Sequence, residues 1–193
     1  MMKSDLRLAV EANDFEEAVE KVENVYELDD VIDIFAEAAE KGEEVILEWG
    51  GCAPSKHKGV DDCEYTQKGE APVTLDDLDI DEDMLLDYIE DVLNEEKTNV
   101  SISVAASDFD EAINELMEDP DEVIESFAMS RYRTIDLSWG ECRPFTYKGS
   151  DDCEWIQLGS ANVDINDFDI DKQMLLKYIY KAKVNQEKSK EKK

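Results

Sequence analysis

The chain repeats itself, and the repeat limits the folds that it can adopt. Without a gap, residues 49–89 and residues 139–179 match at 23 of 41 positions. Upstream, after a shift of four residues in the alignment, NDFEEAVEKV at 13–22 matches SDFDEAINEL at 107–116. So long a repeat predicts one structural unit that is used twice, with an apolar core in each copy.

The length of the chain fits this division. A chain of 193 residues can form two units of about 90 to 100 residues each, and each unit can bury a modest core. We predict a first unit over 1–96, a second unit over 97–184 and a lysine-rich tail over 185–193. The tail departs from helical patterning and is predicted to be disordered.

Apolar spacing predicts the order β-α-α-β-β-α within each unit. Alternating apolar residues at 6–10 and 100–104 indicate an opening strand. Two helices follow, with Asn13 and Ser107 as the expected N-caps of the first, and then two strands joined by a loop with two cysteines. A last helix closes each unit. The predicted fold class is α+β, with two tandem, pseudo-twofold copies and small antiparallel sheets.

All four cysteines lie in the repeated loop, which reads WGGCAPSKHKGVDDCEYTQKG at 49–69 and WGECRPFTYKGSDDCEWIQLG at 139–159. Separate free thiols would not explain this placement. A disulfide across each loop is geometrically possible, although the expected cytosolic setting disfavours it. A structural zinc ion would cross-link a loop that has little core of its own, with thiolates as ligands. Disulfides and free thiols stay open beside zinc, whose predicted ligands, in one shared site or two separate ones, are Cys52, Cys63, Cys142 and Cys153.

Acidic residues dominate the composition, with 51 Asp and Glu against 20 Lys and Arg and a net charge of -31. Residues 1–96 hold 31 acids and 7 bases, a net of -24, whereas residues 97–176 hold 18 and 6, a net of -12. Such a field repels DNA and RNA and attracts a basic surface, so the predicted partner is a basic nucleic-acid-binding protein. The carboxylates predicted to contact it are Asp76, Asp77, Asp79, Asp81, Glu82, Asp83, Asp87, Glu90 and Asp91.

Motifs for catalysis are missing from the sequence. One histidine cannot complete a Ser-His-Asp or Cys-His arrangement in both copies, and neither GxGxxG nor GxxxxGK occurs. The run DDLDIDED at 76–83 fails the calcium-loop pattern, because the sixth position from Asp77 is Glu82 where glycine is required. Instead, Leu78 and Ile80 are predicted to point inward and Asp81 to cap the last helix. We therefore expect a protein that is not an enzyme.

The sequence also predicts a cytoplasmic protein. No apolar run approaches the roughly 20 residues of a membrane span, and MMKSDLRLAV at the start lacks the apolar core of a secretory signal. If a phage encodes the protein, the expected location is the cytoplasm of its host.

In size and charge the chain resembles the small acidic inhibitors that phages and mobile elements carry against restriction enzymes and CRISPR effectors. The segments that carry this resemblance are EANDFEEAVEKVENVYELDD at 11–30 and DDLDIDEDMLLDYIEDVLNEE at 76–96. Some anti-CRISPR proteins that act on Cas9 are similar in size and charge, and some of them bind zinc. Duplex DNA presents one negative charge per roughly 1.7 Å of axis, a density that acidic helices can imitate.

The resemblance implies a non-catalytic inhibitor that binds the nucleic-acid-facing surface of a defence nuclease, either a CRISPR effector or a restriction enzyme, and blocks the loading of DNA or RNA. The alternative function is a zinc-stabilised protein-interaction domain whose acidity serves solubility only.

Overall fold

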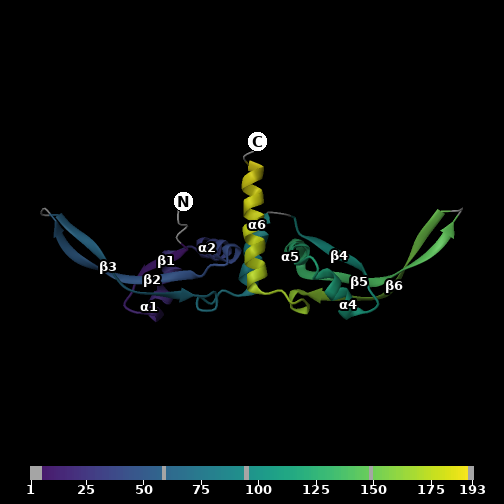
Figure 1. The fold of residues 1–193 in the computed structure, drawn as a ribbon, viewed down its shortest axis with the longest axis horizontal. Helices are drawn as coiled ribbons and strands as arrows, with labels where there is room; N and C mark the ends of the chain where they lie inside the picture. The colour runs from purple at the N-terminus through teal and green to yellow at the C-terminus, as the bar shows by residue number, and fades with distance from the viewer. Residues whose placement is uncertain (1–5, 58–59, 94–95, 148–149, 191–193) are drawn as a thin grey trace. The chain divides into compact units, whose positions relative to one another are not determined.

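The structure is a computed structural model that describes residues 6–57, 60–93, 96–147 and 150–190. Within these ranges the side chains of 53–57, 60–64, 147 and 150–151 are left undescribed. In the described part of the chain the fold is mixed α+β, with six α-helices and two three-stranded sheets (Figure 1). The predicted α+β class is therefore confirmed.

Strands and helices alternate in the same order along both halves of the chain. The elements of the first half are β1 (Arg7–Glu11), α1 (Phe15–Val25), α2 (Leu28–Lys41), β2 (Val45–His57), β3 (Val60–Val73) and α3 (Glu82–Leu93). Those of the second half are β4 (Thr98–Ala105), α4 (Phe109–Leu116), α5 (Pro120–Met129), β5 (Ser130–Tyr147), β6 (Ser150–Asp164), the 3-10 turn η1 (Ile165–Asp167) and α6 (Lys172–Lys190).

Each sheet is mixed, and the prediction of purely antiparallel sheets is wrong. The strand orders are β1-β2-β3 and β4-β5-β6. The outer pairs β1–β2 and β4–β5 are parallel, whereas β2–β3 and β5–β6 are antiparallel, as predicted for the strands beside the cysteines. Parallel pairing is possible here because two helices separate the paired strands, whereas a tight hairpin would make them antiparallel.

The cysteine segments are strands rather than the predicted loops. Pairing between β2 and β3 continues from Val45 to His57, and pairing between β5 and β6 reaches Tyr147. In both hairpins the register shifts at a Trp-Gly step, at Trp49/Gly50 and Trp139/Gly140. Beyond this bulge each hairpin runs past its helices as a two-stranded arm (Figure 1).

A tryptophan packs at the base of each arm. The ring of Trp49 meets Phe15 edge to face at 5.9 Å, and Trp139 meets Phe109 in the same way at 5.7 Å. A Cβ atom on Gly69 would lie 2.4 Å from the Trp49 ring, which is closer than atoms can approach. Glycine is therefore required at this position because the indole lies against the strand.

The first helix of each half is capped one residue later than predicted. Asp14 and Asp108, rather than Asn13 and Ser107, accept a hydrogen bond from the backbone N–H three residues on. Asn13 and Ser107 instead donate their backbone N–H groups to Glu17 and Glu111. Each aspartate therefore caps the helix, while the following glutamate holds the residue that precedes the cap.

Aspartates cap three further helices, among them Asp81 as predicted. Asp119 caps α5, with Pro120 in its first turn. Asp81 and Asp171 accept hydrogen bonds of 2.9 Å and 2.8 Å from the backbone N–H groups of Met84 and Met174 at the start of α3 and α6.

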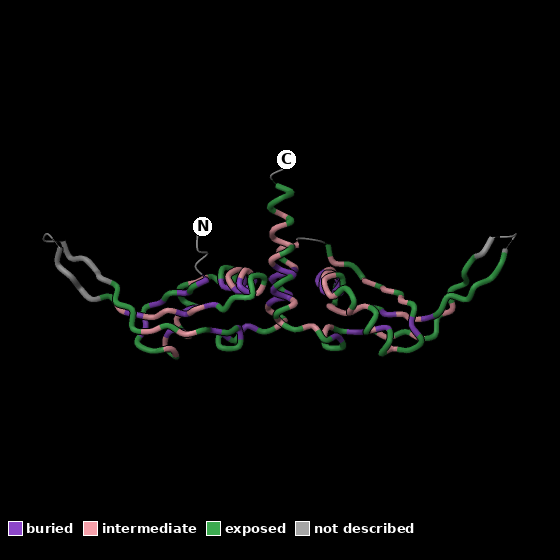
Figure 2. The backbone as a smooth tube through the Cα atoms, in the orientation of Figure 1, coloured by how far each residue is buried: buried purple, intermediate pink, exposed green. Residues whose placement is uncertain are grey.

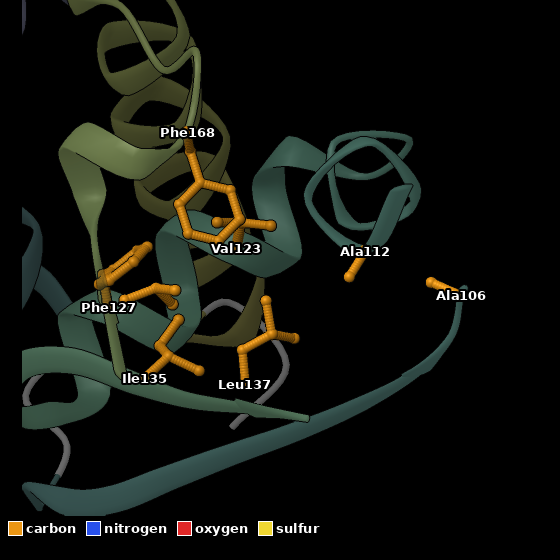
Figure 3. Packing of buried hydrophobic residues seen from close by; sticks show 8 residues of the cluster. Ala106, Ala112, Val123, Phe127, Ile135, Leu137 and Phe168 are labelled. Atoms are coloured by element: carbon orange, nitrogen blue, oxygen red, sulfur yellow. The ribbon is translucent and has the colours of Figure 1, made fainter. Parts of the chain in front are cut away.

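Buried residues concentrate where helices cover one face of each sheet, while the described side chains of the arms are mostly exposed (Figure 2). In β1, Leu8 and Val10 point inward between exposed neighbours, as their alternation predicts. Leu78 and Ile80 are also buried, in agreement with the prediction that they point inward. In the second half, Phe168 packs over Val123 and edge to face on Phe127, at 5.4 Å between the ring centroids (Figure 3).

Two compact units divide the chain. The first comprises Met1–Tyr88 and Leu176–Lys193, and the second comprises Ile89–Leu175. The division differs from the predicted one, because α6 from Leu176 onwards belongs with the first unit. The helix also continues to Lys190 through most of the predicted tail, whose residues 191–193 lie outside the described residues.

The free edge of β1 is partly covered by a side chain. The hydroxyl group of Tyr26 accepts a hydrogen bond of 2.9 Å from the N–H of Ala9 and donates one of 3.2 Å to its carbonyl oxygen. Edge strands expose such groups as templates for pairing with another chain, so this contact closes one pairing position. Of the helices in the described ranges, none has the length and apolar character to span a bilayer.

Candidate partner-binding surface

An acidic stripe runs along α1. Glu16, Glu20 and Glu23 are spaced four and three residues apart, which places them on one face of the helix. All three are exposed, and none of them takes part in an ion pair that the structure describes. The stripe holds three carboxylates along about 10 Å of helix axis.

The matched helix of the second unit, α4, has a different surface. Aligned with Glu16, Glu20 and Glu23 are Asp110, Asn114 and Met117. One carboxylate therefore stands where α1 has three. The acidic stripe is a property of the first unit, although both units share the segment that caps the helix.

The nine predicted contact residues are divided between the two units. Asp76 to Asp87 lie in the first unit, and Glu90 and Asp91 lie in the second. Glu82 and Glu90 are half-buried. The other seven, Asp76, Asp77, Asp79, Asp81, Asp83, Asp87 and Asp91, are exposed.

Two of the nine carboxylates hold the turn before α3. Asp77 accepts hydrogen bonds from the backbone N–H of Thr74 at 2.8 Å and from its hydroxyl group at 2.7 Å. Asp81 is the cap of α3. Between them, Asp79 adopts a left-handed backbone with φ of 52°, which aspartate tolerates better than most residues. Neutralising Asp77 or Asp81 would therefore alter the fold as well as the charge.

Glu90 is engaged within the second unit. Its carboxylate lies 2.6 Å from the Lys97 ammonium and 3.0 Å from Nε of Arg133. With a side chain 19% exposed, it neutralises two cations of its own chain. It is consequently the member of the predicted set that is least available to a partner.

A cluster that the sequence did not reveal joins α2, α3 and α6 within the first unit. The hydroxyl group of Tyr88 donates to Asp33 at 2.6 Å, and the Lys183 ammonium donates to Tyr88 at 2.9 Å and also to Asp33. Burial, followed by the hydrogen bond with Asp33, raises the pKa of Tyr88 to about 12. Lys183 lies close to the predicted tail. The only feature of the sequence that could have indicated this cluster was the helical periodicity of that part of the chain.

Charge pairs also fix the first turn of α1. Lys21 lies 2.6 Å from the Glu17 carboxylate, which accepts from Asn13 as well. The hydrogen bond with Lys21, and then those with Asn13, lower the pKa of Glu17 to about 2. In the second unit, hydrogen bonds from Ser107 lower the pKa of Glu111. These carboxylates therefore stay charged well into the acidic range.

The cysteines of the second arm form a disulfide. Cys142 and Cys153, 5.5 Å apart at Cα, are bonded across β5 and β6. Cys52 is also disulfide-bonded, while the side chain of Cys63 lies outside the described residues. The structure thus has the disulfide alternative in the second arm, and a thiol in a disulfide is not a zinc ligand. Reduced protein could still bind zinc, which stays a prediction.

The interactions that the structure describes at these positions are ion pairs and hydrogen bonds. Among the described residues, no cluster of three or more His, Cys, Asp or Glu side chains is placed to hold a metal ion. Comparison with known proteins adds no homologue: no protein-family model, curated protein or solved structure matches this chain.

Proposed function

We propose that the protein is a non-catalytic acidic inhibitor that binds the nucleic-acid-facing surface of a nuclease, such as a CRISPR effector or a restriction enzyme, and blocks the loading of its substrate. The observation that carries this proposal is the acidic stripe of α1, together with the net charge of -24 over residues 1–96. A surface of this charge favours fast, salt-sensitive association with a basic groove.

The charge density sets the size of surface that must be used. Over the 10 Å spanned by the stripe, duplex DNA carries about six negative charges. The three carboxylates of α1 supply half of that. Exposed acids at the start of α2, namely Glu27, Asp29 and Asp30, can supply more. Both α1 and the start of α2 would therefore face the partner.

Inhibition assays against purified CRISPR effectors and type I restriction enzymes test this proposal. The double variant Glu16→Gln/Glu20→Gln should weaken inhibition, because it removes two carboxylates that hold no described structural contact. Wild-type inhibition should also weaken as salt rises from about 50 mM, since screening acts on exposed charges.

The matched control is Glu115→Gln/Glu118→Gln in the second unit, which removes the same charge from exposed positions. Equal loss of inhibition in both variants would mean that net charge alone matters, without a defined face. Failure to bind any such nuclease at about 50 mM salt would count against the function itself.

The second candidate function is a protein-interaction domain whose acidity serves solubility. Its specific support is the internal pairing of Glu90, Glu17 and Asp33, which shows acids in structural roles. Under this function, Glu16→Gln/Glu20→Gln would reduce solubility and leave partner binding unchanged.

We further infer that the chain consists of two tandem copies of one β-α-α-β-β-α unit. The identity of 23 in 41 aligned positions supports it, as do the bulges at the two Trp-Gly steps. An experimental structure in which β1 to β3 and β4 to β6 fail to superpose would contradict it.

A further inference from the structure

A pocket of about 220 Å³ opens on the first unit between α1, α2 and the turn that precedes α3. Its floor is apolar, with Val22, Val31, Leu78 and Ile80 each at most 6% exposed. At the rim, Leu28 is 43% exposed. An apolar hollow beside an exposed leucine is a feature of binding surfaces, since folding alone does not require it.

Two carboxylates flank this apolar floor. Glu23, the last member of the acidic stripe, and Asp79, in the left-handed turn, both line the pocket and are exposed. An occupant therefore needs an apolar body to fill the hollow and positive charge on either side of it. This pattern combines the two features that mark interaction hot spots, a filled pocket and a charged rim.

The size of the pocket selects one side chain. An engineered apolar cavity of about 150 Å³ holds benzene, whereas drug-sized ligands occupy about 300 to 1,000 Å³. A volume of 220 Å³ accordingly suits one aromatic ring or branched aliphatic group, inserted from a larger molecule that remains outside.

The second unit fills the matched positions with its own side chains. Leu116, Met117 and Phe168 stand where the first unit has Val22, Glu23 and Leu78. All three belong to the hydrophobic core cluster or pack against it. Figure 3 shows Phe168 reaching over Val123, the counterpart of Val31. The smaller residues of the first unit leave this space to an outside group.

We propose that this pocket anchors a single phenylalanine or leucine of a basic partner segment, whose neighbouring Lys and Arg residues pair with Glu23 and Asp79. The proposal deepens the proposed function and rests on it for the partner's basic character. The pocket would supply the specificity of binding, while the acidic stripe would supply the rate of association.

Full-length protein would be titrated with the peptide acetyl-Lys-Arg-Phe-Lys-Arg-amide at about 50 mM salt, beside a peptide with Ala in place of Phe. The Phe peptide should bind at least about tenfold more tightly, as expected for one buried ring. NMR shifts on binding should fall on the methyl groups of Val22, Val31, Leu78 and Ile80. Equal binding of the two peptides would overturn the proposal.

Leu78→Phe introduces the residue that the second unit carries at this position and should abolish the difference between the two peptides. Glu23→Met covers the rim in the same way and serves if Leu78→Phe unfolds. Leu158→Ser removes an apolar side chain that is 50% exposed elsewhere, in β6, and should leave the difference intact. Should both pocket variants keep the tenfold preference, the anchor lies somewhere else.

Charge is tested by Asp79→Asn, which tolerates the left-handed backbone, and should weaken both peptides. The experiments distinguish failure of the pocket proposal from failure of the proposed function. A nuclease that the wild type and Leu78→Phe inhibit equally would refute the anchor and keep the inhibitor. A Phe-dependent peptide preference without any inhibited nuclease would keep the anchor and refute the inhibitor.

Discussion

Within segments whose sequences align well, the two units carry different side chains at particular positions. On the first helix, Glu20 and Glu23 of the first unit match Asn114 and Met117 of the second. In the turn before the last helix, Leu78 matches Phe168. In the second unit, Met117 and Phe168 pack in or against its own core. In the first unit, the matched residues Glu23 and Leu78 line a pocket. Matched positions can thus either fill a core, as in the second unit, or line an open pocket, as in the first.

The last helices repeat this contrast. Exposed positions of α3 hold Asp83, Asp87 and Asp91, and the aligned positions of α6 hold Gln173, Lys177 and Lys181. Acidity therefore tracks the first half of the chain and does not follow from the shared fold.

The largest expected effect is on the free energy of unfolding of the second unit, whose core we expect to be the better filled of the two. Phe127→Ala should lower the free energy of unfolding by about 3 to 5 kcal/mol, because the ring is fully buried and the residual cavity is costly. Its counterpart, Phe35→Ala, should cost about 1 kcal/mol less, since it lacks the ring-on-ring packing that Phe127 makes with Phe168. Urea titration of both variants measures this. Equal losses would mean that the cores are filled alike.

Reduction of the Cys142–Cys153 disulfide should cost up to about 3 kcal/mol of arm stability, because the crosslink closes a loop with a sequence separation of 11. Amide exchange in β5 and β6 beyond Gly140 should accelerate, with little change in the core. Mass analysis with and without reductant gives the thiol count, and metal analysis of untagged, reduced protein tests zinc. Zinc bound at one equivalent per chain would favour the predicted shared site over the disulfide.

Tyr88→Phe should cost about 1 to 2 kcal/mol, because it removes the hydrogen bond that the phenol donates to Asp33 and the one that it accepts from Lys183. Because the pKa of Tyr88 is raised from 10.0 to about 12, the neutral phenol stabilises the fold. This stability is fully present below pH 10 and is lost as the pH rises towards 12. Alkaline unfolding, followed with tyrosinate absorbance, should show a weaker pH dependence in the variant. An unchanged profile would place the titration elsewhere.

The smallest effect concerns the helix caps. With a pKa lowered from 4.5 to about 2, the Glu17 carboxylate stabilises the fold above pH 4.5, and that stability is lost as the pH falls towards 2. Glu17→Gln should therefore flatten acid unfolding over this window. Glu111→Gln should do so less, because Glu111 has Ser107 but lacks a lysine partner such as Lys21. Stability measured by circular dichroism between pH 2 and pH 5 compares the two.

Patterns tied to burial were predictable from the sequence. The alternation at Leu8 and Val10, the cap at Asp81 and the inward side chains at Leu78 and Ile80 all depend on local patterns, and the structure agrees with them. The arms were missed because their described side chains are exposed on both faces of the strands, so no alternation marks them.

Contacts between residues that are far apart in the chain could not be predicted from the sequence. Lys183 binds Asp33 across a separation of 150 residues, and nothing local announces that contact. The parallel direction of the pairs β1–β2 and β4–β5 could not be predicted for a similar reason. The side of the sheet on which β1 and β4 pair depends on how the two connecting helices pack. The nine predicted contact residues were chosen by charge density alone, which cannot separate a carboxylate that holds a turn, such as Asp77, from one that faces solvent.

The hydroxyl group of Tyr26 has a consequence for behaviour at high concentration. By occupying both polar backbone groups of Ala9, it leaves an incoming strand from a second molecule with no ladder to extend at the middle of β1. Tyr26→Phe removes this hydroxyl oxygen without changing the overall charge. The backbone N–H and carbonyl groups of Ala9 would then be free to pair with a strand of another copy, which would promote aggregation.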